Sequence, residues 1–243
     1  MSAGTAPTCV GELPEAESVV FFHAHPDDET LSGGALLAAM VAAGRRVAVV
    51  TATRGERGEV RAGVEIGSDL AGHRVKERDA ALAALGVETG AWLGKARRYT
   101  DSGMRWIAPG VAGPDPEAPP DCLSRADPGQ AGIDLAEFLR AFAAAALISY
   151  DAGGGYHHPD HVACHHIAQE AAAAADLACY ELVSEGIVPP AGAQWIDHPE
   201  QRPRLLSALQ CYPSQLGVEG AQIVHVGGQR QVVQTGVWLF RTR

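Results

Sequence analysis

The chain has 243 residues, of which 47% are hydrophobic, and its formal net charge is −10 at pH 7. That length and apolar content suffice for one large domain, while a negative charge without any Lys/Arg block argues against a nucleic-acid partner. No apolar run approaches the ~20 residues that a membrane helix needs. Five scattered cysteines without a CxxC pattern fit a reducing cytoplasm. Residues 1–17 lack the pattern of a signal peptide, so we expect a frayed N-terminus and a cytoplasmic protein.

Strand and helix signals alternate along the chain, which predicts an α/β fold: a Rossmann-like, mostly parallel sheet with helices on both faces. The expected strands cover residues 18–22, 46–53, 91–93, 146–150 and 180–183. The expected helices cover residues 31–43, 75–85, 133–145, 162–175 and 199–210. The remaining stretches are an expected active-site loop at 94–132, a loop at 185–198 and a terminal hairpin at 223–240. We treat residues 1–243 as a single domain.

The segment His25-Pro26-Asp27-Asp28-Glu29 stands between the first expected strand and the first expected helix. Ligands of α/β proteins bind at such junctions, outside the carboxyl ends of the strands. His25 and Asp28 can turn toward one point and supply two thirds of a His/His/carboxylate zinc set, which leaves Asp27 close enough to act as a base. The alternative is that Asp27 and Asp28 only cap the helix, because aspartate satisfies free N–H groups at a helix start.

A second segment, His157-His158-Pro159-Asp160-His161, also joins an expected strand to an expected helix. In a parallel sheet all such junctions lie on one edge, so we expect the two segments to meet in space. Several histidines compete as metal ligands here: His157, His158, His161 and His165. His161 and His165 stand four residues apart on one expected helix, which is the spacing of a helical zinc pair.

These two segments resemble the hallmark motifs of the LmbE-like, or PIG-L, family of zinc-dependent de-N-acetylases. The matching motifs are Ala24 to Glu29 and His158 to His161, and the likeness extends to residues 53–59, 73–77, 101–104 and 214–215. Within the family, the chain most resembles the deacetylases of mycothiol biosynthesis, followed by the mycothiol S-conjugate amidases. The resemblance implies a cytoplasmic hydrolase that removes acetyl from an N-acetylglucosamine-type sugar.

The resemblance favours His25, Asp28 and His161 as the zinc ligands over the helical pair. Zinc lowers the pKa of a bound water to about 7, and Asp27 would then take the proton as the oxygen attacks the amide carbonyl. Ligands of this kind also accept ferrous iron.

Three further residues, in the second segment or directly before it, are candidates for the chemistry. His158 would stabilise the tetrahedral oxyanion and protonate the leaving amine. Asp160 would hold His158 charged and oriented, or serve as a carboxylate at the helix N-terminus. Tyr156, in a glycine-rich stretch, would help to bind the reacting carbonyl or act as a packing residue.

Substrate-contacting positions of the family match Ser32, Arg74 and Asp101, and Met104 lines the pocket there. Ser32 favours the deacetylase branch, since the amidases typically have lysine at this position. The alternatives are a turn role for Asp101 and a solvated helix face for Arg74. The chain is shorter than the mycothiol deacetylases at its C-terminal end, which leaves the aglycone open and keeps an antibiotic sugar as an alternative.

The expected partner is thus a small N-acetyl sugar, with no nucleic acid or membrane, and a homo-oligomer stays open. A non-catalytic metal- or sugar-binding module is the main rival, although such a module would not need Asp27 and His158. A nicotinamide-dependent enzyme is opposed by the first junction, which carries no G-x-G-x-x-G.

Overall fold

A computed structural model describes residues 16–243, so residues 1–15 of the expected frayed terminus lie outside it. Seven strands form the central sheet, in the order β3-β2-β1-β6-β7-β12-β8. The first five are mutually parallel, whereas β12 runs antiparallel to both of its neighbours. The strands are β1 (Ser18–His23), β2 (Arg46–Thr51), β3 (Thr89–Trp92), β6 (Ala146–Tyr150), β7 (Ala178–Leu182), β8 (Gln194–Asp197) and β12 (Gly236–Arg241). The predicted mostly parallel sheet is confirmed.

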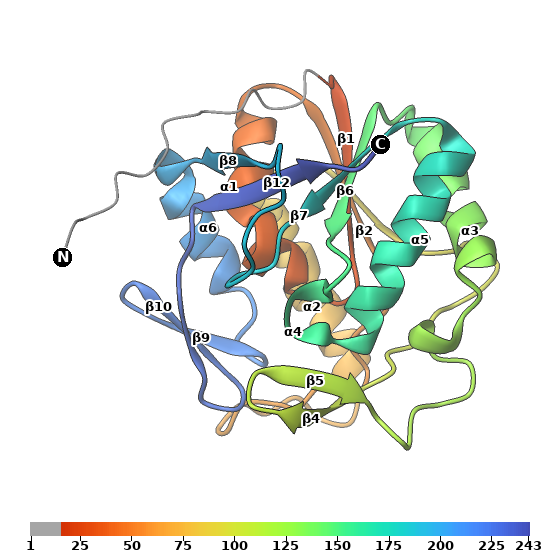
Figure 1. Cartoon of the computed structure of the whole chain (residues 1–243). Coiled ribbons are helices and arrows are strands. Elements are labelled where there is room, and N and C mark those ends of the chain that lie inside the picture. The colour runs from red at the N-terminus through yellow and green to blue at the C-terminus, as the bar shows by residue number, and fades with distance from the viewer. Residues whose placement is uncertain (1–15) are drawn as a thin grey trace.

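Helices cover both faces of this sheet (Figure 1). They are α1 (Asp28–Ala42), α2 (Leu70–Leu85), α3 (Pro128–Phe142), α4 (Gly154–His157), α5 (Pro159–Ala175) and α6 (Arg202–Leu209). Side chains alternate along a strand, so Val19 and Phe21 of β1 pack in the core beneath α1, α2 and α6. Val20 and Phe22 pack in the opposite core, beneath α3 and α5. Cys164 and Cys179 fill buried positions.

Several helices begin earlier than the apolar pattern predicted, because their first turns contain polar residues, glycine or proline. Helix α2 starts at Leu70, where the Asp69 side chain caps it by accepting from the Gly72 N–H. Helix α3 starts at Pro128 behind the cap Asp127, with proline in the first turn. Helix α1 starts at Asp28, inside the first His-Pro-Asp segment. Polar first turns carry no apolar periodicity, so a pattern search places such starts too late.

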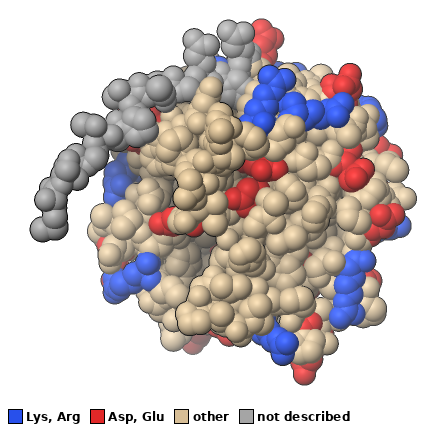
Figure 2. All heavy atoms as spheres, viewed as in Figure 1, with Lys and Arg blue, Asp and Glu red and all other residues tan. Residues whose placement is uncertain are grey.

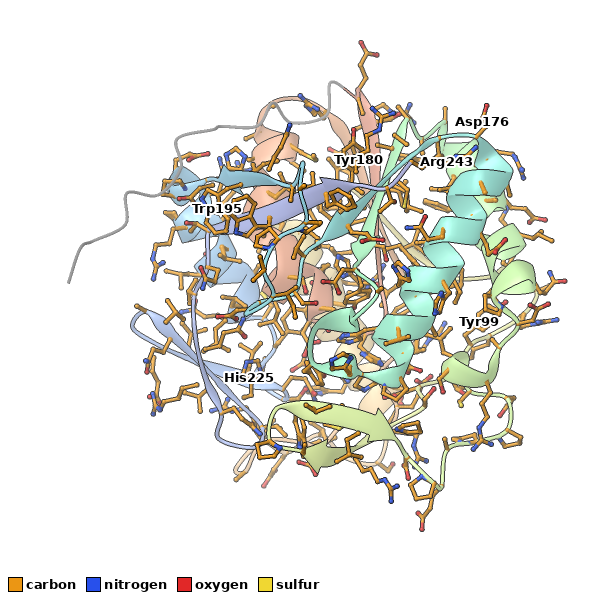
Figure 3. All side chains as sticks on the ribbon, viewed as in Figure 1. Tyr99, Asp176, Tyr180, Trp195, His225 and Arg243 are labelled. Atoms are coloured by element: carbon orange, nitrogen blue, oxygen red, sulfur yellow. The ribbon has the colours of Figure 1, made fainter. Side chains whose placement is uncertain are left out.

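Residues 94–132 are more ordered than the predicted loop. They contain a two-stranded hairpin of β4 (Met104–Ala108) and β5 (Val111–Pro114), followed by a short 3₁₀ turn at Leu123–Arg125. Figure 3 shows Tyr99, from the start of this segment, beside α3, where its hydroxyl donates to Asp134. The segment is therefore attached to the body of the protein through α3.

The C-terminal part departs most from prediction. Strand β8 lies inside the expected loop at 185–198, and a small sheet of β9 (Leu216–Glu219), β10 (Gln222–His225) and β11 (Arg230–Val232) precedes β12. The expected hairpin around Gly227-Gly228 exists, but its second strand is β11. Residues 236–241 instead join the main sheet, and Arg243 ends beside Asp176, 3.1 Å away (Figure 3). Among the described residues, none of the helices has both the length and the apolar character to cross a bilayer.

Candidate metal centre and active site

The two His-Pro-Asp segments meet at one edge of the sheet, as predicted. Strands β1 and β6 are parallel neighbours, with Phe21 paired to Ile148, so the segments that follow them lie side by side. The rings of His25 and His161 have centroids 5.4 Å apart, and His25 Nε2 lies 3.1 Å from Asp160 Oδ2. Residues 135 positions apart in sequence are thus in direct contact.

Asp28 lies between the two predicted histidine ligands. Its Oδ2 atom is 3.1 Å from His25 Nδ1 and 3.3 Å from His161 Nε2. Burial opposes ionisation of this carboxyl group, but the adjacent His161 and His25 rings hold its pKa well below the usual range. A charged carboxylate between two imidazoles is the donor set that zinc commonly takes.

His161 is held in the form that can bind a metal. Its Nδ1 atom lies 3.1 Å from the Gly154 carbonyl oxygen, which can only accept, so Nδ1 carries a proton and Nε2, 3.3 Å from Asp28 Oδ2, is the nitrogen left to bind a metal. Nε2 is buried and has no hydrogen-bond partner among residues 16–243. A buried lone pair without a partner is costly in a folded protein, and a metal ion at this point would satisfy it. The residues present therefore fit a metal.

Distance alone does not select a single third ligand. Ligand atoms of His25, His158 and His161 all lie within 4.8 Å of one another, and so do those of His25, Asp101 and Asp160. Asp28 contacts both predicted histidines through its carboxylate. The His158 ring centroid lies 4.7 Å from that of His25 and 4.8 Å from that of His161. The set of His25, Asp28 and His161 consequently stays a prediction, with His158 as its competitor.

The other competing histidines point elsewhere. His165 Nδ1 lies 3.2 Å from both the Tyr150 carbonyl oxygen and Glu181 Oε1. His157 is exposed on α4. The geometry does not support the helical pair of His161 and His165, because His165 is engaged by β6 and β7.

The Asp27 side chain makes no capping hydrogen bond to α1 within the described chain. Its backbone carbonyl accepts from the Thr30 and Leu31 N–H groups instead. Its φ of 101° lies where residues other than glycine are strained, and such strain is concentrated at functional sites. Burial raises the pKa of its carboxyl group to about 8, against the opposing effect of Arg74, whose Nη2 lies 3.4 Å from Asp27 Oδ2. Asp27 is thus a carboxyl group held in place beside the ligand set, and nearby positive charge such as that of Arg74 favours the ionised form that can accept a proton.

The predicted role of Asp160 as the partner of the His158 ring is wrong. The Asp160 carboxylate contacts His25 Nε2, and it also accepts from the Ser102 N–H at 2.9 Å and from the Ser102 hydroxyl. Only the Asp160 backbone reaches His158, by donating its N–H to His158 Nδ1 at 3.1 Å. The carboxylate therefore orients a predicted ligand, His25, as outer carboxylates commonly do for metal-binding histidines.

His158 and Tyr156 border the ligand set. The Tyr156 ring stands edge-on to the rings of His158 and His161, with centroid separations of 5.8 and 5.4 Å. Burial, together with the neighbouring His25 and His161 rings, holds the pKa of His158 well below its ordinary value. Both rings lie next to the predicted ligand His161, and their carbonyl-binding and proton-transfer roles stay predictions.

The predicted substrate contacts have different surroundings. Arg74 is buried and donates to the carbonyl oxygens of Pro26 and Gly55, so it fixes the first segment instead of lying on a solvated face. Asp101 is also buried; it accepts from the N–H groups of Arg57 and Gly103 and lies 3.6 Å from His25 Nε2. Ser32 and Met104 are half-buried. Sugar contact by these four residues stays a prediction.

Sequence reasoning assigned no role to two residues of this region. The Tyr150 ring stacks on His161 at 4.4 Å, and its hydroxyl accepts from the Ala24 N–H at 3.0 Å. Ser102 binds the Asp160 carboxylate. The position of Tyr150 at the end of a strand, just before the second segment, was a usable signal, as was the place of Ser102 within the motif at 101–104.

Comparison with known proteins agrees with this geometry. The PIG-L family, described as GlcNAc-PI de-N-acetylase, matches residues 20–172. The chain belongs to this family. Over 177 residues it is 40% identical to the 1D-myo-inositol 2-acetamido-2-deoxy-alpha-D-glucopyranoside deacetylase of Kribbella flavida, covering 70% of this chain and 58% of that protein. The chain spans about half the length of the first curated relatives it matches.

Solved structures share the fold at lower sequence identity. A deacetylase of teicoplanin biosynthesis aligns with 93% of this chain and 98% of its own, with a TM-score of 0.64 and 21% identity. A 4-carboxy-2-hydroxymuconate hydratase from Pseudomonas putida aligns with 93% of this chain and 96% of its own, with a TM-score of 0.61 and 18% identity. Because a deacetylase and a hydratase share this fold, the reaction has to be argued from the site.

Proposed function

We propose that this protein is a metal-dependent hydrolase that removes the acetyl group from an N-acetylglucosamine-type sugar. The main support is the arrangement around Asp28, with His25 and His161 on either side and with His161 Nε2 buried, without a hydrogen bond and directed at the Asp28 carboxylate. Membership of the PIG-L family and the names of its curated relatives support the same chemistry.

His25, Asp28 and His161 would hold the metal, which when bound would supply a water of lowered pKa and polarise the acetyl carbonyl. Asp160 would keep His25 in position through its Nε2. Zinc is the metal we propose, because two imidazoles and one carboxylate are a common catalytic zinc set, and ferrous iron is the alternative.

Asp27 takes the proton of the attacking water, and Arg74 keeps its carboxylate in place. The water oxygen forms a bond to the acetyl carbon, and the carbon–nitrogen bond of the amide breaks. His158 stabilises the oxyanion and gives a proton to the leaving nitrogen, while Tyr156 helps to bind the carbonyl. The products are acetate and a free amino sugar, and we place the reaction in the cytoplasm.

An assay of both products tests this function. Zinc-loaded protein is incubated with a panel of N-acetylglucosaminides, and released primary amine and acetate are measured in parallel. We expect equal amounts of the two, with a strong reduction in Asp27→Asn. A folded, zinc-loaded protein that releases neither product from any member of the panel would overturn the proposal.

A further inference from the structure

The hairpin of β4 and β5 presents large apolar side chains to solvent near the candidate site. Trp106 is 50% exposed and Ile107 is 59% exposed. They line an open hollow of about 370 Å³ whose other walls are Ala108, Pro109, Gly110 and Gln229. The only polar side-chain groups on this lining are the Gln229 amide and the Trp106 indole N–H, so the hollow offers few hydrogen bonds to a ligand.

Aromatic rings connect this hollow with the predicted catalytic histidines. The Trp106 ring lies 5.5 Å from the Tyr156 ring, tilted by 37°. Tyr156 in turn stands edge-on to His158 and His161. Figure 1 shows the hairpin crossing directly beside α4, which carries Tyr156. If the acetyl group of a substrate lies at these histidines, the Tyr156 ring lies between that reacting group and Trp106.

We propose, on the basis of the proposed deacetylase function, that Trp106, Ile107 and Tyr156 form a subsite for an apolar aglycone of the N-acetyl sugar. An aromatic or aliphatic aglycone would cover apolar surface that is now in water. A polyol aglycone would gain little there, because its hydroxyl groups would lose water and meet few polar partners.

The surface charge is compatible with this choice of aglycone. Figure 2 shows that the face around the hairpin consists mainly of uncharged residues, with only a few acidic or basic side chains. The Arg57 side chain nearby is already paired with Asp115 at 2.5 Å. Arg105, exposed on β4 beside Trp106, is a cation within this hairpin, so an apolar aglycone is favoured by the exposed rings of Trp106 and Tyr156 and not by a lack of positive charge.

Kinetics with two glycosides test the subsite. The zinc-loaded enzyme is assayed with p-nitrophenyl and methyl N-acetyl-glucosaminides, and the ratio of their kcat/KM values is compared across variants. We expect a ratio of about ten or more in the wild type, since a desolvated aromatic contact supplies roughly one factor of ten. Trp106→Ala should bring the ratio near one, and Trp106→Phe should retain most of it.

Two exposed isoleucines provide further variants. Ile107 tests the subsite independently in case Trp106→Ala does not fold, and Ile133 is a matched control. Ile107→Ala removes a wall of the hollow and should lower the ratio, whereas Ile133→Ala, 49% exposed on α3, should leave it unchanged. An unchanged ratio in both Trp106→Ala and Ile107→Ala would overturn the subsite. A wild-type preference for an inositol glycoside over the nitrophenyl glycoside would do the same.

Direct binding separates this proposal from the deacetylase function. Calorimetry of the metal-loaded protein with p-nitrophenyl and methyl glucosaminide, the amine products, needs no turnover. Tighter binding of the nitrophenyl compound that is lost in Trp106→Ala supports the subsite even if no acetate is ever released. Equal affinities for the two compounds in the wild type overturn the subsite and leave the deacetylase proposal to its own assay.

Discussion

The junction behind β1 and the junction behind β6 both carry His, Pro and Asp, but the surrounding structure holds them differently. In the first, residues 24–29, the chain is mostly buried and tied to distant elements: Arg74 donates to the Pro26 carbonyl at 2.6 Å, and the Tyr212 hydroxyl donates to the Glu29 carboxylate at 2.5 Å. In the second, residues 153–161, the stretch 155–157 is exposed, and Gly154, Gly155 and His157 have positive φ angles.

This difference assigns different tasks to the two junctions. The first is fixed by α2 and by the segment that follows α6, so it sets the positions of His25, Asp27 and Asp28. The second combines buried residues, Asp160 and His161, with an exposed aromatic ring, Tyr156, that borders solvent. We infer that the first junction supplies fixed geometry and that the second also receives the substrate.

The largest effect is expected at the buried end of the second junction. His161→Ala should lose its metal, because it removes the one ring nitrogen there that is buried without a partner. The loss of affinity should exceed the roughly 10–100-fold typical of residues that only support a ligand. Metal analysis after dialysis measures it, and His165→Ala is the control that should stay loaded. The reverse pattern would make the second junction a helical metal pair.

At the first junction, Asp27→Asn should keep about one equivalent of metal and lower kcat by about 10²–10⁴-fold, the usual contribution of a general base. The amide preserves the size of the side chain and removes the group that accepts the proton. Parallel measurements of metal content and turnover decide the case. If metal is lost together with activity, Asp27 belongs to the ligands and the two aspartates have exchanged roles.

A smaller effect is expected at Ser102, which links the segment before the hairpin to Asp160 of the second junction. Ser102→Ala removes one of the hydrogen bonds that orient the Asp160 carboxylate toward His25, but it keeps the backbone N–H donor. Metal affinity should fall by about 3–10-fold, less than for a complete loss of the outer carboxylate. Ser124→Ala is a matched control, because the Ser124 hydroxyl contacts only the Cys122 sulfur within residues 16–243. Equal affinities of both variants would show that Ser102 does not position His25.

The smallest effect concerns His165, on the helix behind the second junction. Its hydrogen bond to Glu181 raises its pKa above the ordinary value, so the folded state binds this proton more tightly than the unfolded state. The resulting stabilisation is present below about pH 6.5 and is lost as the pH rises through the raised pKa. Urea unfolding of wild type and His165→Gln should therefore differ more near pH 5.5 than near pH 9. A pH-independent difference would exclude the proton linkage.

Much of this arrangement could be predicted from the sequence because its causes are local. Apolar runs at residues 18–22 and 146–150 identify two buried strands, and the parallel-sheet rule then brings His25 and His161 to one edge. Asp160 was misassigned because its partner, His25, lies 135 residues away, and its neighbour His158 was the nearer guess. Arg74 was predicted to contact the substrate, with a solvated helix face as the alternative, since nothing in its helix shows that two backbone carbonyls lie within its reach.

The C-terminal strands were predicted least well, again for a physical reason. Residues 232–240 alternate as an exposed hairpin strand does, and the pattern does not say which strand they pair with. Strand β12 pairs with β7 and β8, and these partners are determined by the strand order of the whole sheet, not by the sequence of β12 itself. Strand β8 has only four residues, which is too short for a pattern to distinguish from a loop.

Strand β12 also determines the order in which the protein can assemble during synthesis. Its residues enter between β7 and β8, and 54 positions separate Leu182, the end of β7, from Gly236. At about 5–20 residues per second, the ribosome needs roughly 3–10 s to cover that distance. The five parallel strands, which carry both His-Pro-Asp junctions, exist throughout this interval with β7 as an unpaired edge. Unpaired edges are templates for association with other chains, so nascent molecules are most exposed to aggregation just before β12 arrives.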